Sequence, residues 1–316
     1  MSAARLVAQG VEILLAVAAA PLLMGWVNQC RAWLQNKSGP GLLQPYRLLR
    51  KLFHKDAVIA EGASPLFRLV PYVQFAAMGL AAAIIPTLWT GLPFAVAADA
   101  IALVGLFATA RVALALAAMD IGTAFGSLGA RREMLVGFLA EPALLMVFFT
   151  ASLISHSTSL PTTVDVLAHR ELALYPSLAF AGIAFLMVLL AENARIPVDN
   201  PATHLELTMI HEATVLEYSA RHLALIEWSV ALKLFNYTCI GLALFLPWGL
   251  AADTGDNLGL LLAVPVTTVK LAAAGAGLAL VETLNAKMRI FRAPEFLATA
   301  FLLAVLGLLV HLLLGS

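Results

Sequence analysis

The feature that most constrains the fold is a series of long apolar runs separated by polar segments. We count eight runs, at about residues 6–27, 69–90, 97–119, 134–154, 173–191, 223–250, 258–283 and 295–314. Each is long enough for a helix that crosses a hydrocarbon layer about 30 Å thick. Only 12% of the residues are charged, whereas soluble domains are nearer about 25% charged. The sequence therefore predicts an all-α, polytopic membrane protein that forms a single membrane domain over residues 1–316.

Basic residues are distributed unequally between the connecting segments. Of the 19 lysine and arginine residues, 14 follow the first, third, fifth and seventh runs. Cytoplasmic segments of membrane proteins carry such an excess of positive charge. We therefore expect both termini outside and these connections in the cytoplasm. The first run lacks a convincing basic region before it, so we expect it to be a span and not a cleaved signal peptide.

Cysteine and histidine usage argues against a redox or metal centre in this chain. Cys30 and Cys239 are the only two cysteines, and they are far apart in the sequence. The pair His211-Glu212 is followed by Val215 at the place where a zinc-binding HExxH motif has its second histidine. Any redox centre is therefore expected on another polypeptide. The net charge of zero gives no indication of a nucleic-acid partner.

Residues 31–68 form a basic cytoplasmic loop in this interpretation. Glycine and proline residues between Ser38 and Pro45 indicate a turn, and a short amphipathic helix is expected over residues 46–54. Its apolar face holds Leu48, Leu49, Leu52 and Phe53, and its basic residues are Arg47, Arg50, Lys51 and Lys55. A helix of this kind can lie in the membrane interface and contact anionic lipid.

Acidic and histidine side chains gather in the loop 192–222 and its flanks. Residues 191–228 hold six of the 19 acidic residues and three of the seven histidines. Pro197 ends the helix of the fifth run, and a second helix is expected from Ala202 to about Arg221. One face of it would hold Glu206, Ile210, Ala213 and Glu217, and another would hold His204, Thr208 and His211. So much charge beside a bilayer is costly, which indicates proton handling, a docking surface or both.

Further ionisable residues fall within or at the ends of the apolar runs: Arg111, Asp120, Glu141, Glu227, Lys233, Lys270 and Glu282. A charge at the centre of a bilayer costs about 2.5–3.5 kcal/mol. We therefore expect Lys233 and Lys270 to face the interior of the bundle, near carboxylates. Two interpretations remain open. The charges are either fixed interhelical ion pairs or a chain of titratable groups that leads from the inner loop to the middle of the membrane.

Three motifs carry a resemblance to a known family. They are GPGLLQP at residues 39–45, AENARIPVD at residues 191–199 and Glu217-Tyr218-Ser219. With the plan of eight runs, they resemble subunit 1 of respiratory complex I and its counterpart in energy-converting nickel–iron hydrogenases. The stretch DNPATHLELT at residues 199–208 is similar to the formate hydrogenlyase and hydrogenase-4 branch. It departs from the quinone-reducing branch, which usually has Asp-Leu-Pro-Glu-Ala-Glu there.

The resemblance implies a non-catalytic subunit in the cytoplasmic (inner) membrane of a bacterium or archaeon. Its implied partners are hydrogenase-like large and small subunits, iron–sulfur subunits and antiporter-like membrane subunits. The nickel–iron centre and the iron–sulfur clusters would lie on those partners, so this chain would bind no cofactor. In the quinone branch the region of the basic loop forms a quinone chamber, a function that is doubtful here.

The resemblance and the burial argument together give two sets of candidate residues. The proton-path or coupling set is Glu141, Glu192, Glu206, Glu217, Glu227, Lys233 and Lys270. The loop and docking set is Arg47, Arg50, Lys51, Arg195, Asp199, His204 and His211. Two alternatives stay open, namely the quinone-binding subunit of a complex I-type NADH dehydrogenase and a stand-alone cation/proton antiporter. The large polar inner loop suits docking better than the alternating access of an antiporter.

Overall fold

The computed structural model describes residues 3–91, 93–169, 176–199, 210–251 and 257–314. Within these ranges the chain is helical and contains no β-strand. The helices are α1 (Ala3–Leu34), α2 (Gln44–Phe53), α3 (Pro65–Ile84), α4 (Ala100–Asp120), α5 (Ala124–Ser155), α6 (Leu160–His169), α7 (Pro176–Glu192), α8 (His211–Val215), α9 (Ala220–Phe245), α10 (Asn257–Leu284) and α11 (Ala293–Leu314). Two short 3-10 helices lie at Pro93–Ala97 and Ile290–Arg292.

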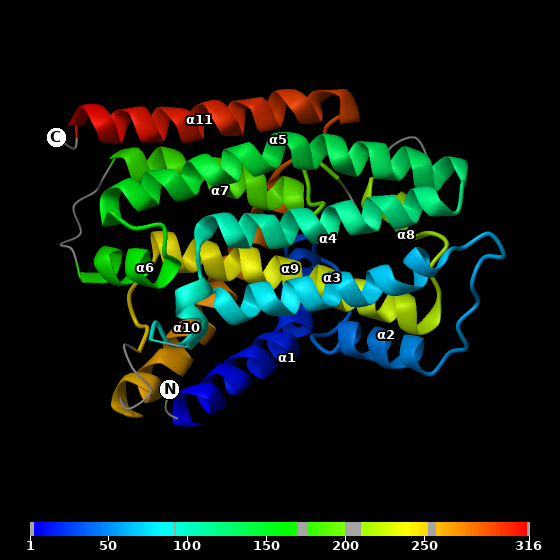
Figure 1. Cartoon of the computed structure of the whole chain (residues 1–316), viewed down its shortest axis with the longest axis horizontal. Helices are drawn as coiled ribbons and strands as arrows, with labels where there is room; N and C mark the ends of the chain where they lie inside the picture. The colour runs from blue at the N-terminus through cyan, green and yellow to red at the C-terminus, as the bar shows by residue number, and fades with distance from the viewer. Residues whose placement is uncertain (1–2, 92, 170–175, 200–209, 252–256, 315–316) are drawn as a thin grey trace.

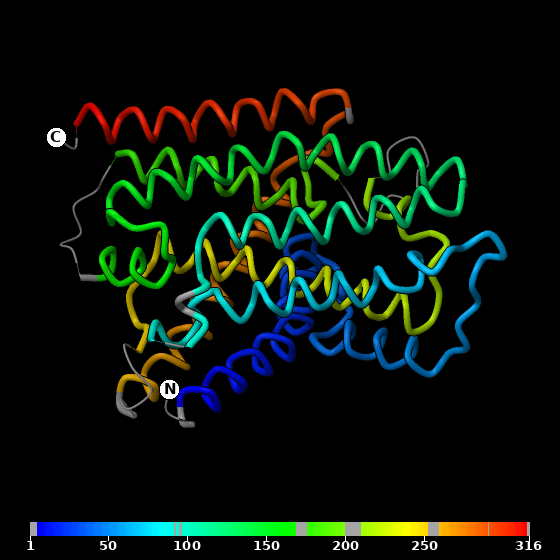
Figure 2. Tube along the Cα trace, viewed as in Figure 1, coloured from blue at the N-terminus to red at the C-terminus, as the bar shows by residue number. Residues whose placement is uncertain are grey.

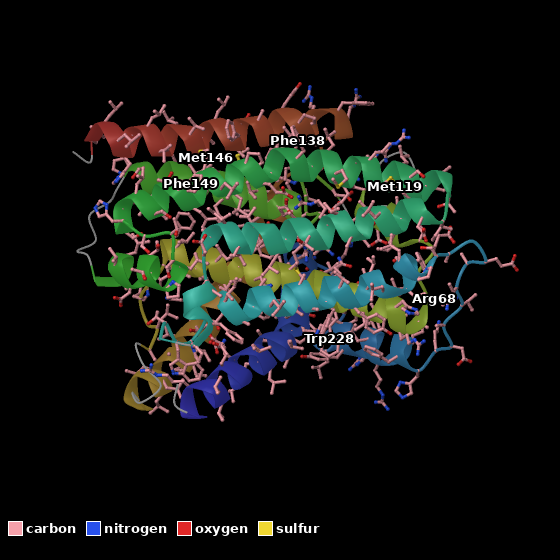
Figure 3. All side chains as sticks on the ribbon, in the orientation of Figure 1. Arg68, Met119, Phe138, Met146, Phe149 and Trp228 are labelled. Carbon is pink, nitrogen blue, oxygen red and sulfur yellow. The ribbon has the colours of Figure 1, made fainter. Side chains whose placement is uncertain are left out.

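Seven of these helices are long and apolar enough to cross a membrane: α1, α3, α4, α5, α9, α10 and α11. The shorter apolar helix α7 lies at the place of the fifth predicted run. The prediction of an all-helical polytopic membrane protein is therefore confirmed. Many apolar side chains point outward, among them Phe138 of α5, which is 74% exposed (Figure 3). An outward apolar surface is what a lipid environment favours.

The long helices lie roughly side by side and run lengthwise through the molecule (Figures 1 and 2). Helix α11 packs against α5 and α7, α3 packs against α4 and α9, and α1 packs against α9 and α10. Helix α1 begins and α11 ends at one end of the bundle, which we call the termini end (Figure 1). Helix α2 and residues 54–64 lie toward the opposite end, which we call the loop end (Figure 2).

Helix α2 confirms the expected amphipathic helix, with slightly different bounds. Leu49 and Leu52 are buried against Ala224 of α9, and the ring of Phe53 lies edge-on to that of Trp228. Arg50 and Lys51 stay exposed on the other side. Leu49 and Leu52 are therefore covered by the protein itself, whereas Leu48 and Phe53 remain partly exposed beside the basic face, which is free to meet a partner.

Helix α5 begins ten residues earlier than the apolar run that predicts it, so Arg131 and Arg132 are part of this helix and not of a loop. The reason is the capping residue Thr123, whose side chain accepts a hydrogen bond from the N–H of Gly126 at 3.3 Å. A cap of this kind satisfies an otherwise unpaired N–H group of the first turn. The polar connection predicted between residues 155 and 172 likewise contains a helix, α6.

The helix predicted from Ala202 to Arg221 is wrong in its second half. Helix α8 ends at Val215, a turn follows, and α9 begins at Ala220. The cause lies in Ser219, whose hydroxyl accepts the N–H of Val58 at 2.9 Å and donates to the carbonyl of Val58 at 2.6 Å. These bonds hold Ser219 in an extended conformation. Residues 200–209, which include His204 and Glu206, lie outside the described residues.

Candidate functional site

The centre of the site is a network of four charged side chains from four helices. Arg111 of α4 pairs with Glu141 of α5 and with Glu192 at the end of α7. Lys233 of α9 places its Nζ 2.9 Å from Oε2 of Glu192. The side chains of Arg111 and Glu192 are only 3% and 2% exposed. Burial of these charges is tolerated because two cations balance two carboxylates at hydrogen-bond distance.

A glycine makes room for this network. Gly137 of α5 faces Arg111, and a Cβ atom at this position would overlap the guanidinium group. The bulky arginine is therefore accommodated by the absence of a side chain on the neighbouring helix.

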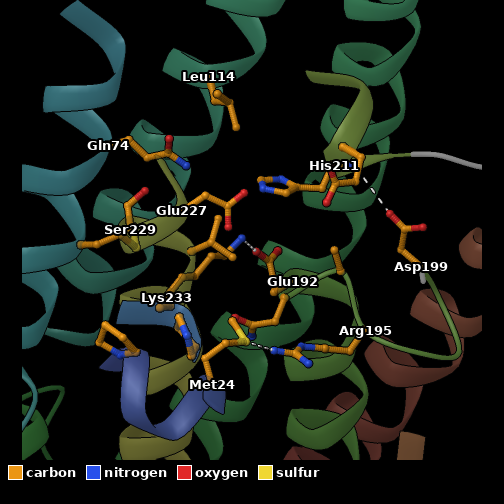
Figure 4. Close-up of a pocket in the computed structure, with 18 of the residues that line it drawn as sticks. Met24, Gln74, Leu114, Glu192, Arg195, Asp199, His211, Glu227, Ser229 and Lys233 are labelled. Atoms are coloured by element: carbon orange, nitrogen blue, oxygen red, sulfur yellow. Dashed lines mark hydrogen bonds and ion pairs between the residues drawn. The ribbon is translucent and has the colours of Figure 1, made fainter. Parts of the chain in front are cut away.

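A cavity of about 300 Å³ lies beside the network. Its polar and charged lining residues are Asn28, Arg31, Gln44, Gln74, Arg111, Glu133, Glu192, Asn193, Arg195, Asp199, His211, Glu212, Glu227, Ser229 and Lys233. Its apolar lining includes Met24, Leu48, Met78 and Phe107. Residues from α1, α2, α3, α4, α5, α7, α8 and α9 thus meet at one space (Figure 4).

Glu227 links this cavity to the acidic loop. The imidazole of His211 points toward the carboxylate of Glu227 (Figure 4), and both residues line the cavity. His211 and Glu212 are both within electrostatic reach of Glu227. Lys233 lies six residues further along α9, about 9 Å by helix geometry. The titratable groups therefore follow one another from the loop into the bundle.

A second ion cluster joins the loop to α1 and α10. Glu282 of α10 has a fully buried side chain whose two oxygens pair with different arginines. Arg195 of the loop lies at 3.0 Å and Arg31 of α1 at 3.4 Å. A carboxylate shared by two arginines fixes three segments that are distant in the sequence.

Asp199 connects the segment that follows α7 with the start of α8 and with the segment that follows α10. Its Oδ1 lies 3.2 Å from Nζ of Lys287, and its Oδ2 accepts the N–H groups of Ile210 and His211 at 3.3 and 3.4 Å. The N–H of Met288 donates to the carbonyl of Pro197 at 2.9 Å. The connection after α10 is therefore tied to the loop at two points.

The structure brings seven of the fourteen candidate residues together. Glu192, Glu227, Lys233, Arg195, Asp199 and His211 line the cavity, and Glu141 joins the network through Arg111. Glu217 is exposed in the turn before α9 and does not line the cavity. Arg47, Arg50 and Lys51 lie on the exposed basic face of α2. His204 and Glu206 lie outside the described residues.

Among the residues that the structure describes, the partners of Lys270 are backbone carbonyls and an aromatic ring. Its Nζ donates to the carbonyl of Leu246 at 2.6 Å and to that of Trp248, beyond the end of α9. It also lies 5.0 Å from the centre of the Trp248 ring. Carbonyl groups past a helix end have no partner within the helix, so they attract a cation. Asp253 and Asp256 lie outside the described residues.

Several residues of the site were missed or left unassigned by sequence reasoning. Arg111 and Glu282 stand out in the sequence as charges in apolar runs, but their central roles depend on partners 30 to 251 residues away. Gln74, Glu133 and Ser229 give no such signal. Glu12, a buried carboxylate of α1, could have been noticed as the only acidic residue of the first run.

The fold and the site define a class, namely polytopic helical membrane proteins with an ionisable network buried in the bundle and open to a polar loop. The comparisons with known proteins agree with this class. The model of the NADH dehydrogenase family matches residues 8–313, and the chain belongs to this family.

The relatives found by sequence extend over most of the chain. Formate hydrogenlyase subunit 4 of Escherichia coli (strain K12) is 33% identical over 297 residues, which cover 94% of this chain and 95% of that protein. Hydrogenase-4 component C of the same organism is 34% identical over 236 residues, or 74% of this chain and 73% of that protein.

A solved structure has the same fold. A chain of the membrane-bound sulfane sulfur reductase, an archaeal respiratory membrane complex, matches with a TM-score of 0.83 and 20% sequence identity. The match covers 96% of this chain and 98% of that chain. At this identity the likeness concerns the fold alone.

Proposed function

We propose that this chain is a membrane-embedded, non-catalytic subunit of a multisubunit hydrogenase-type complex of the formate hydrogenlyase or hydrogenase-4 kind. In this role it anchors a soluble redox arm and couples that arm to ion movement in the membrane. The two Escherichia coli relatives support the kind of complex. The observation that carries the coupling role is the buried network of Arg111, Glu141, Glu192 and Lys233 beside the cavity.

The chemistry of these side chains assigns them different tasks. Glu227 and Glu192 hold and pass protons, with Lys233 between them. Arg111 stays charged at any working pH, so it stabilises the two carboxylates and does not itself carry a proton. The side chain of Glu141 is 31% exposed, which makes it the group that hands a proton to a neighbouring membrane subunit.

The loop end is the docking side in this proposal. The exposed Arg47, Arg50 and Lys51 of α2 meet an acidic surface of the soluble arm. The proposed partners there are hydrogenase-like large and small subunits and iron–sulfur subunits, which carry the metal centres. Antiporter-like membrane subunits receive the ions on the side of Glu141.

The test uses Glu227→Gln and Glu192→Gln in the whole complex, assayed in inverted membrane vesicles for hydrogen-linked turnover and proton movement. We expect the Glu227→Gln complex to assemble with proton movement lost or turnover slowed. Glu192→Gln has the same expected effect with some loss of stability, because it leaves Arg111 and Lys233 with less negative charge. Glu217→Gln is the matched control, since Glu217 is exposed outside the cavity. Unchanged proton movement in both variants would remove the proton-path role.

A second candidate function rests on the cavity itself. Its volume of about 300 Å³ and its apolar lining by Leu48, Met78 and Phe107 would suit part of a quinone. Quinone analysis of the purified complex separates this candidate from the first. The cavity also holds several charged groups, which favour water and protons over an apolar ring.

A further inference from the structure

Several buried polar atoms lack a partner, and three of them form a row. Among the side chains that the structure describes, Oε1 of Gln74, Oδ1 of Asn236 and Oε2 of Glu12 are buried without a hydrogen bond. We call these three residues the buried acceptor row. Buried polar groups are nearly always paired with protein or with ordered water. All three atoms are acceptors, so their missing partners are donors.

The row follows α3 from the cavity toward the termini end. Gln74 of α3 lines the cavity together with Lys233. One turn further, about 6 Å along the helix, the carbonyl of Met78 accepts the side-chain amide of Asn236 at 2.9 Å. Thr87, just past the end of α3, contacts Glu12. Gln74 and the contact of Asn236 therefore lie at successive turns of α3, and Glu12 lies beyond the end of this helix, at Thr87.

The row is joined to the ion network through α9. Lys233 and Asn236 are three residues apart on this helix and so share a face. Lys233 pairs with Glu192, while Asn236 is completely buried next to α3. The network at Glu192 and the row at Asn236 are thus separated by a single helical turn.

Glu12 has the geometry of a group that can take up a proton. It is 1% exposed. Its Oε1 accepts the N–H groups of Thr87 and Leu88 at 2.9 and 3.0 Å and the hydroxyl of Thr87. Its Oε2 carries no bond. Oε1 is saturated by donors, which leaves Oε2 as the oxygen on which a proton can be added and from which it can leave.

A small second cavity is lined by Thr87, the residue whose N–H and hydroxyl bind Glu12. Its volume is about 20 Å³, and it is lined by Thr87, Cys239, Thr267 and Lys270 among others. One water molecule needs roughly 10–15 Å³ by the same measure. Thr87 thus contacts Glu12 on one side and a water-sized space on the other.

We propose that water molecules fill the buried acceptor row and connect the ion network to Glu12, which is a further proton-holding residue near the termini end. A proton released from the network passes along these waters, protonates Oε2 of Glu12, and leaves through the second cavity, so the carboxylate is restored. This inference rests on the proposed proton-coupling function and extends it by one residue and one route.

The first experiment measures proton movement in vesicles that contain the whole complex with Glu12→Gln. Glutamine keeps the oxygen that accepts from Thr87 and Leu88 but cannot hold a proton. We expect the complex to assemble and proton movement to be lost, and we expect the same loss for Asn236→Leu. Thr238→Val is the matched control, because the Thr238 hydroxyl donates within α9 itself, to the carbonyl of Leu234.

The second experiment tests the water itself and needs no transport. Cys30 and Cys239 are replaced by alanine, and Asn236→Cys is compared with Leu234→Cys for the rate of reaction with methyl methanethiosulfonate. Leu234 is nearly as buried as Asn236, but it lies two residues away and therefore on the opposite face of α9. Thiols ionise and react only where water reaches them, so we expect the cysteine at position 236 to react faster.

The outcomes separate this inference from the proposed function. Normal proton movement in Glu12→Gln overturns the role of Glu12, whereas a wild-type complex that moves no protons overturns the proposed function. If the Glu12→Gln complex fails to assemble, or the wild type moves no protons, the rates of cysteine modification still test whether water fills the buried acceptor row. Equal rates at positions 236 and 234 overturn it.

Discussion

At the scale of single residues, Arg111 is the side chain on which the buried network depends most. It is the shared partner of Glu141 and Glu192, and it lies in the middle of an apolar helix. Removing one member of a buried ion pair costs about 3–5 kcal/mol, because the remaining charge has lost its partner. Without Arg111, Glu141 loses this partner and Glu192 keeps only Lys233, so the effect falls on folding as well as on function.

We therefore expect Arg111→Met to lower the thermal stability of the protein in detergent strongly, and to do so more than Arg50→Met. Arg50 is exposed on α2, where loss of a charge costs little. Thermal unfolding of both variants in the same detergent is the measurement. Equal melting temperatures would mean that the carboxylates find other partners or are protonated.

Tyr218, at the junction before α9, makes a different kind of contribution. Its hydroxyl donates to the carbonyl of Phe67 at 3.0 Å, and its ring stacks on that of Phe67 at 3.9 Å. Burial and then the nearby Asp120 raise the pKa of Tyr218. The stability that this tyrosine contributes is therefore fully present below the ordinary pKa of a phenol, about 10, and is lost as the pH rises further.

We expect Tyr218→Phe to cost about 1–3 kcal/mol at pH 7, because the buried carbonyl of Phe67 is left without a donor. The variant should also lose less stability than the wild type between pH 9 and 11 (about one unit either side of the phenol pKa). Chemical denaturation at both ends of that range is the measurement. The same pH dependence in both proteins would contradict the role of the phenol.

At the scale of elements, α2 packs on the protein with one face and offers the other face for docking. The inner face packs on α9 through Leu49 and Leu52, and the outer face presents Arg47, Arg50 and Lys51. Reversing the three basic residues to glutamate leaves the buried face intact. We expect this triple variant to release the soluble arm on purification while the membrane subunits stay together.

Arg289→Glu is the control for this variant, because Arg289 is also basic and exposed but follows α10. Co-purification in mild detergent followed by mass spectrometry shows which subunits remain. Full retention of the soluble arm by the triple variant would count against docking at α2.

Sequence reasoning located the spans well because length and hydrophobicity alone decide them. The boundaries that it missed depend on contacts that local patterns do not contain. The early start of α5 follows from one cap, Thr123. The break before α9 follows from hydrogen bonds between Ser219 and Val58, 161 residues away. The candidate site behaves in the same way, since the sequence identified Glu192 and Arg195 as candidates but not their buried partners, Arg111 and Glu282.

At the scale of the whole molecule, the arrangement predicts a topology that can be measured. Helix α1 begins and α11 ends at the same end of the bundle, opposite the residues 54–64 (Figure 1). With the basic residues in the cytoplasm, both termini are expected outside. An epitope tag at either terminus should then be accessible in intact spheroplasts, and a tag in residues 54–64 only after lysis. The reverse pattern would invert the orientation and with it the proposed direction of the proton path.

The cluster of Arg31, Arg195 and Glu282 has a consequence for how this chain can evolve. Its carboxylate is fully buried between two arginines from different parts of the chain. A change at Glu282 alone leaves two cations facing each other, and a change at Arg195 alone leaves a buried carboxylate with one weaker partner. A single substitution at any of these positions is therefore expected to destabilise the protein. Across related sequences we expect the three residues to persist or to be replaced together, as one inherited unit.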